Sequence, residues 1–109
     1  MDEFAIIYVG SGTPDKMPKT KEEGMAHRQK WMDWVASLGD AVVNPGQPMM
    51  EHKLVSANAV DEVNDNSKFT GYAIIKAENI DAAVEIARGD PFLDMGGNIQ
   101  VAKLMKMPG

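Results

Sequence analysis

The sequence contains no cysteine among its 109 residues. This absence excludes a disulfide framework, a thiolate metal site and a cysteine nucleophile. The chain has only two histidines, His27 and His52, and no carboxylates at a spacing typical of metal ligands. We therefore expect no structural or catalytic metal and no bound cofactor.

Basic residues are also few and scattered, with 11 Lys and Arg against 16 Asp and Glu, which gives a net charge of −5. This balance disfavours a nucleic-acid partner, because affinity for phosphates comes from Lys and Arg. No apolar run is long enough for a membrane span. The start, MDEFAIIYVG, has acidic residues where a signal peptide has basic ones, so we expect a cytoplasmic protein.

The remaining composition is that of an ordinary globular chain, with 44% hydrophobic and 25% charged residues. The length predicts one domain over residues 1–109, large enough for a hydrophobic core. The apolar run Phe4–Val9 predicts a buried strand that ends at a glycine-rich loop. Thr20 and Glu23 form a capping-box pattern, so a helix is expected from about Lys21 to Leu38, ending at Gly39.

The rest of the chain predicts further strands and one more helix. Asn79 is expected to cap the second helix, which Gly89 and Pro91 end. Residues 45–68 are harder to assign, with His52–Ala57 as a hairpin arm and Val60–Ser67 as a polar loop. The other predicted strands are Asp40–Asn44, Phe69–Ala77 and Asn98–Met107.

This order of elements predicts an α+β fold of the ferredoxin-like βαββαβ type, with an antiparallel sheet. The strands FAIIYV and YAII are apolar at successive positions, so both of their faces require burial. Two helices can cover only one face of such a sheet. We therefore expect a homodimer in which the two sheets meet and form a dimeric α/β barrel.

Two segments, GMAHRQKWMDWVASL and FTGYAIIKAENIDAAVEIARGDPF, resemble the YCII-related family and its DGPF-type relatives. The resemblance covers nearly the whole chain. The matching features are a helix histidine with large apolar residues four and seven positions later (His27, Trp31, Trp34), the strand opening Phe69-Thr70-Gly71, and Asp90-Pro91-Phe92 after the second helix. The Asp-Gly-Pro-Phe motif of one branch is absent before Phe69, where this chain has Asn64-Asp65-Asn66-Ser67.

The resemblance implies a ferredoxin-like fold that dimerises as an α/β barrel. It also implies a site in which a helix histidine works with an aspartate in a pocket between helix and sheet. His27 matches the histidine, and Asp90 is our choice for its partner. Some family members remove chloride from chlorinated hydroxyaromatic rings, whereas most have no established activity.

His27 is the main chemical candidate, because an imidazole changes its charge near neutral pH and can act as a general acid or base. The alternative is a structural histidine on an apolar helix face, since His27, Trp31 and Trp34 recur at helical spacing. Asp90 either pairs with His27 or simply forms an Asp-Pro turn. His52 lies between Glu51 and Lys53 and is expected to be exposed.

Two functions of different classes remain open. In the first, His27 and Asp90 are catalytic residues of a small enzyme that moves a proton in lyase, isomerase or dehalogenase-type chemistry. Its pocket would bind a small molecule through Tyr8, Trp31, Pro91 and Phe92, with Trp31 as the floor. In the second, the protein is a non-catalytic dimeric module that binds a small ligand or a protein, and His27 is structural.

Overall fold

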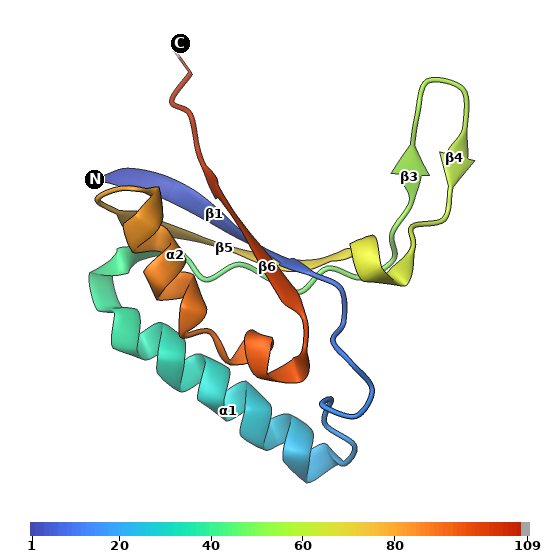
Figure 1. The fold of residues 1–109 in the computed structure, drawn as a ribbon, viewed down its shortest axis with the longest axis horizontal. Helices are drawn as coiled ribbons and strands as arrows, with labels where there is room; N and C mark the ends of the chain where they lie inside the picture. The colour runs from blue at the N-terminus through green and yellow to red at the C-terminus, as the bar shows by residue number, and fades with distance from the viewer. Residues whose placement is uncertain (108–109) are drawn as a thin grey trace.

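The computed structural model describes residues 1–107. A four-stranded antiparallel sheet has the strand order β2-β5-β1-β6, and a separate hairpin is formed by β3 and β4 (Figure 1). The helices are α1 (Lys21–Leu38) and α2 (Ile80–Arg88), with three short 3₁₀ helices, η1 (Gly39–Ala41), η2 (Asp65–Ser67) and η3 (Pro91–Met95). The strands are β1 (Asp2–Val9), β2 (Val42–Asn44), β3 (Leu54–Val55), β4 (Val60–Asp61), β5 (Phe69–Ala77) and β6 (Asn98–Lys103).

The predicted ferredoxin-like arrangement is confirmed by this strand order. In chain order the sheet strands and helices run β1-α1-β2-β5-α2-β6, and the β3–β4 hairpin is an insertion between the second and third strands of the sheet. Both central strands, β1 and β5, therefore come from chain segments far apart in sequence. Their pairing places Phe4 opposite Ile75 and Ile6 opposite Ala73.

The hydrophobic core lies between the sheet and α2. Side chains that alternate along β1 and β5 are buried on this face, because successive residues of a strand point to opposite sides. Ala83 and Ala87 of α2 are buried against them. The core side chains of the strands are Phe4, Ile6, Tyr8, Ala73, Ile75 and Ala77.

The predicted cap of α1 is present with one difference. The backbone N–H of Glu23 donates to Oγ1 of Thr20 at 3.0 Å. The Glu23 carboxylate, however, accepts from the backbone N–H of Lys19 at 2.8 Å, so it does not return to the N–H of Thr20. The prediction of helix bounds is confirmed at both ends, and Gly39 follows α1 with a positive φ of 55°.

The predicted apolar stripe of α1 is half-buried, although no residue of the helix is fully buried. The helix lies against η3 and the end of α2, where the Trp34 indole approaches Gly89. Through this stripe α1 therefore contacts η3, the end of α2 and, at Tyr8, the sheet. A cavity lies between part of α1 and the sheet.

The segment 45–68 contains more regular secondary structure than the sequence indicated. His52–Ala57 does contain one hairpin arm, β3, and Val60–Asp61 forms the other arm where a polar loop was expected. Nε2 of His52 lies 2.7 Å from the carbonyl oxygen of Phe69, which anchors the hairpin base to β5, and His52 is half-buried rather than exposed. At the other end of the chain, β6 ends at Lys103, four residues earlier than predicted.

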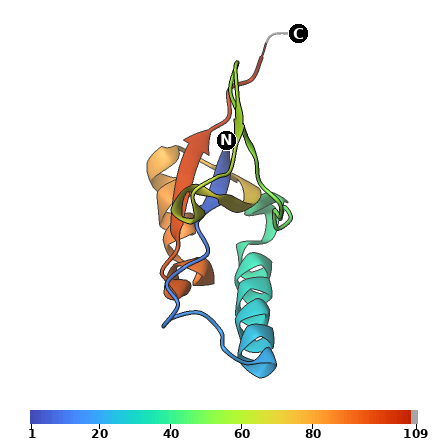
Figure 2. The same ribbon diagram turned by 90° about the vertical axis from the view of Figure 1, so that its right-hand side faces the viewer.

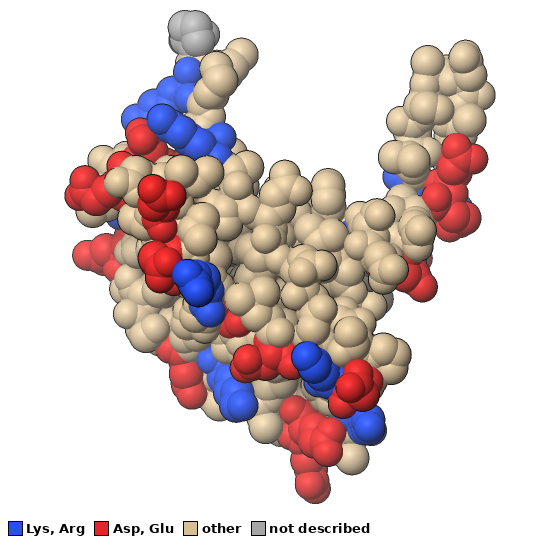
Figure 3. Space-filling model, viewed as in Figure 1, with Lys and Arg blue, Asp and Glu red and all other residues tan. Residues whose placement is uncertain are grey.

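The hairpin and the C-terminal end of the described chain both extend away from the two helices (Figure 1, Figure 2). The outer part of the hairpin, Leu54–Val60, has no charged residue. In Figure 3 the outer part of the hairpin has no blue or red atoms, whereas charged side chains surround the helices. No helix within residues 1–107 is long and apolar enough to cross a membrane.

Candidate active site

The larger cavity near the predicted residues has a volume of about 530 Å³ and lies between α1 and the sheet. On the α1 side, the wall is formed by His27 and Arg28 and, one turn later, by Trp31 and Met32. The opposite wall comes from β1, the start of β5, η3 and the loop after β2. The lining residues are Tyr8, His27, Arg28, Trp31, Met32, Pro45, Gly46, Gln47, Pro48, Thr70, Gly71, Tyr72 and Phe92.

Tyr8 projects from β1 toward the helices because it alternates with Phe4 and Ile6 on the core face. Its hydroxyl donates to Oδ2 of Asp90 at 2.5 Å. The same hydroxyl oxygen accepts from the Trp31 indole N–H at 3.3 Å. Burial and the neighbouring Asp90 carboxylate raise the pKa of Tyr8, so the phenol stays protonated. Tyr8 is therefore a fixed hydroxyl in the cavity wall.

Asp90 is held by its local backbone as well as by Tyr8. It precedes Pro91 and caps η3, where its Oδ1 accepts from the backbone N–H of Phe92 at 2.9 Å. The residue is only 2% exposed. Burial raises the pKa of Asp90, although the hydrogen bonds from Tyr8 and Phe92 and the charge of His27 act in the opposite direction. The Asp-Pro turn, one of the two alternatives left open by the sequence, is thus present and also positions a buried carboxyl group.

Aromatic side chains form much of the cavity surface. The rings of Tyr8 and Phe92 have centroids 4.9 Å apart and are tilted by 52°, a favourable arrangement for two aromatic rings. Trp31 is half-buried on α1 and is fixed by its hydrogen bond to Tyr8. Pro91, which precedes Phe92, is buried but is not among the residues that line the cavity. The site therefore has an aromatic surface next to the Tyr8 hydroxyl.

His27 is half-buried and lines two neighbouring cavities. It is close enough to Asp90 for its charge to affect that carboxyl group, but the hydrogen bonds of Asp90 go to Tyr8 and Phe92. Asp90, our choice for the partner of His27, therefore lies near it, and the hydrogen bonds of its carboxyl group are made to other residues.

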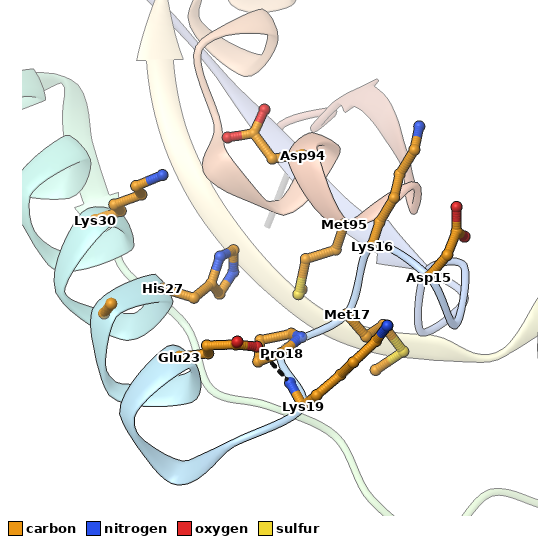
Figure 4. Close-up of a pocket in the computed structure, with 11 residues that line it drawn as sticks. Asp15, Lys16, Met17, Pro18, Lys19, Glu23, His27, Lys30, Asp94 and Met95 are labelled. Atoms are coloured by element: carbon orange, nitrogen blue, oxygen red, sulfur yellow. Dashed lines mark hydrogen bonds between the residues drawn. The ribbon is translucent and has the colours of Figure 1, made fainter.

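The second cavity has a volume of about 430 Å³ and is more polar. It lies between α1, the segment before α1, and η3, with His27 projecting into it from the helix (Figure 4). Lys30 and Asp94 reach toward it from opposite sides, from α1 and η3 (Figure 4). Its other charged lining residues are Asp15, Lys16, Lys19 and Glu23.

Several lining residues were not identified from the sequence. Arg28 and Met32 lie beside the predicted stripe on α1, and residues 45–48 come from a loop without a recognisable motif. The position of residues 45–48 depends on the pairing of Pro48 with Gly71 of β5, which is a tertiary contact. Within residues 1–107, no group of three or more His, Asp and Glu side chains is arranged to hold a metal ion.

No protein-family model matches the chain, and no curated protein matches its sequence. Among solved structures, the chain is similar to the 5-chloro-2-hydroxyhydroquinone dehydrochlorinase from Burkholderia phenoliruptrix, in complex with 2,5-dihydroxybenzoquinone. The TM-score is 0.58 at 15% identity, and the match covers 94% of this chain and 93% of the other. At this identity the similarity shows a related fold.

Proposed function

We propose that the protein is a small acid–base enzyme acting on a hydroxylated aromatic molecule. The observation that carries this proposal is the Tyr8 hydroxyl, which lines the larger cavity beside His27 and donates to the buried Asp90. A hydroxyl oriented in this way can accept a hydrogen bond from a substrate hydroxyl group. The half-buried imidazole of His27 lies in the same cavity wall, where it can take or return a proton.

Asp90 acts in this proposal as a positioning residue. It is buried behind the Tyr8 hydroxyl and does not line the cavity, so it has no direct access to a substrate. Its hydrogen bond fixes the direction of the Tyr8 O–H. The catalytic residue is then His27, with Tyr8 as a ligand-orienting group.

The aromatic surface favours a planar substrate. Trp31 and Phe92 offer faces and edges to a ring, and a molecule of one aromatic ring fits a cavity of about 530 Å³. Removal of hydrogen chloride from a chlorinated hydroxyaromatic ring is one reaction of this class. It takes protons from hydroxyl oxygens, returns one to a ring carbon and releases chloride, which one acid–base group can support.

We also propose membership of the YCII-related family, with the single domain and cytoplasmic location expected for this chain. The family proposal is supported by the ferredoxin-like fold and by the position of His27 in a pocket between helix and sheet. The fold is shared with the dehydrochlorinase, which supports a test of that reaction here.

The deciding experiment measures chloride release from 5-chloro-2-hydroxyhydroquinone by the wild type and by His27→Gln. We expect the substitution to abolish turnover while the free energy of unfolding changes by no more than about 1 kcal/mol, because a half-buried cavity residue contributes little packing. His52→Gln is the matched control, since His52 lies outside both cavities. Equal turnover by the wild type and His27→Gln would contradict the role of His27.

The alternative is a non-catalytic module that binds a small ligand. It is favoured by the absence of a direct hydrogen bond between His27 and Asp90, whose partners are Tyr8 and Phe92. Saturable binding of hydroxyquinones without turnover by the wild type would support this alternative.

We further propose that the protein is a homodimer formed through the sheet face that the helices do not cover. Ile7, Tyr72 and Ile74 lie on that face and are only half-buried, while residues on the helix side are buried. The hairpin supplies a second uncharged surface, with Leu54 57%, Val55 72% and Val60 65% exposed. A two-stranded hairpin is marginally stable alone. A second copy would cover both surfaces.

A further inference from the structure

The charge of the larger cavity differs from that of the protein as a whole. The chain carries a net charge of −5, yet no carboxylate of residues 1–107 lines this cavity. Two basic side chains, His27 and Arg28, are present in its wall. The nearest buried carboxyl group, Asp90, is only 2% exposed and is already hydrogen-bonded to Tyr8.

The Arg28 guanidinium is not committed to another partner within the described residues. The ion pairs in residues 1–107 use the cations of Lys53, Lys68, Arg88 and Lys103. A guanidinium carries a permanent charge and five N–H donors in a planar fork that matches a carboxylate or phenolate oxygen. Arg28 is thus available to a ligand in the cavity that it lines.

The position of Arg28 on α1 places this charge beside the aromatic part of the site. Residues 27, 28, 31 and 32 all line the cavity, so Arg28 lies one turn before Met32 and next to His27 along the same helix. The wall therefore combines a cation, an imidazole and the Trp31 indole within two turns. A ligand that binds the cation, the imidazole and the indole together has a planar ring and an anionic oxygen.

We propose that Arg28 selects anionic aromatic ligands, of the benzoate or phenolate class, for the larger cavity. The ring lies among Trp31, Tyr8 and Phe92, and its charged oxygen accepts hydrogen bonds from Arg28. This inference rests on the proposed function for the location of the site and adds the charge of the substrate class. Arg28 is a specificity residue, separate from the proton transfer assigned to His27.

The test uses benzoate and benzamide, which have nearly the same shape and differ in charge. Binding is followed by the NMR signals of the two indole N–H groups. Trp31 lines the cavity and Trp34 does not, so the Trp34 signal is an internal reference. We expect benzoate to shift the Trp31 signal with a lower Kd than benzamide.

Three variants separate the local effect of Arg28 from general electrostatics. Arg28→Gln is expected to weaken benzoate binding about three- to fivefold, as for an exposed ion pair, and to leave benzamide binding unchanged. Arg28→Lys is expected to retain part of the preference, because it keeps the charge and loses the planar fork. Lys30→Gln removes the same charge from the same helix, but Lys30 lines the other cavity (Figure 4), so benzoate affinity should change less than in Arg28→Gln.

The inference is overturned if the wild type binds benzamide as tightly as benzoate, or binds neither. It is also overturned if Arg28→Gln and Lys30→Gln weaken benzoate binding equally, which would indicate a diffuse charge effect. These readouts are independent of turnover. Failure of the acid–base proposal appears as unchanged turnover in His27→Gln and leaves the ligand preference measurable.

Discussion

The Tyr8 hydroxyl on β1 donates a 2.5 Å hydrogen bond to the Asp90 carboxylate, which lies 82 residues later in the sequence, between α2 and η3. This bond joins the first strand of the sheet to the segment that caps η3. Because both groups are buried, removing either one leaves the other without one of its hydrogen-bond partners. The pair therefore links the stability of the fold to the shape of the site.

A double-mutant cycle measures this link. Tyr8→Phe leaves a buried carboxylate without one of its donors, and we expect it to lower the free energy of unfolding by about 1–3 kcal/mol. Asp90→Asn is expected to be destabilising in the same range, and the double variant should lose less than the sum. Urea denaturation gives all four values. Additive losses would show that the two groups are uncoupled.

The pH dependence of stability provides a second test of Asp90. Burial raises the pKa of Asp90 above the unfolded value of about 3.9. Between these two pKa values the native state binds more protons than the unfolded state, so this residue makes stability fall as pH rises. In Asp90→Asn this contribution is absent. We therefore expect the stability advantage of the wild type over Asp90→Asn to shrink as pH increases from 4, measured by denaturation at several pH values. A difference independent of pH would contradict the raised pKa.

Two glycines give opposite predictions for the same substitution. Gly46, in the loop that lines the larger cavity, has a φ of 75°, and an added Cβ would lie 1.6 Å from the backbone oxygen of Tyr72. Gly46→Ala should therefore destabilise the protein by about 2 kcal/mol or more. Gly24 lies in α1 with no atom within 4 Å of an added Cβ, so Gly24→Ala should stabilise it by about 0.5–1 kcal/mol. Thermal denaturation checks both, and equal effects would contradict the loop geometry.

The uncovered sheet face is tested by placing a charge on it. Ile7 points to this face, whereas Ile75 is 1% exposed and points to the core. By sedimentation at micromolar concentration, we expect the wild type at about twice 11.9 kDa and Ile7→Lys as a folded monomer. Ile75→Lys should fail to fold, because it buries an unpaired charge. A monomeric wild type would contradict the homodimer.

The hairpin allows a separate test of assembly. Val55→Lys changes a side chain that is 72% exposed in the single chain, so its effect on the folding of one copy should be small. If a second copy covers the hairpin, the substitution should raise the dimer dissociation constant, measured by dilution in sedimentation experiments. Lys53→Gln at the base of the same hairpin is the control. An unchanged dissociation constant would exclude the hairpin from the interface.

The sequence was sufficient for the elements whose signals are local. The Thr20 cap and the apolar spacing predicted both ends of α1, and β5 was predicted with its observed bounds. Such signals act over a few residues, through backbone hydrogen bonds and side chains on one face. The β3–β4 hairpin was only half identified, because Val60–Asp61 is short, exposed and paired across a loop.

For the site, the sequence by itself determined which side chains have useful chemistry: His27, Tyr8, Asp90 and the aromatic residues near them. It also determined the strand and helix order that makes the ferredoxin-like fold. Only the tertiary structure decided that Asp90 bonds to Tyr8 and not to His27, and that Arg28 and the loop 45–48 line the cavity. The physical reason is that these contacts join segments far apart in the chain. Their geometry depends on how α1 lies against η3 and the sheet, which no local pattern of residues encodes.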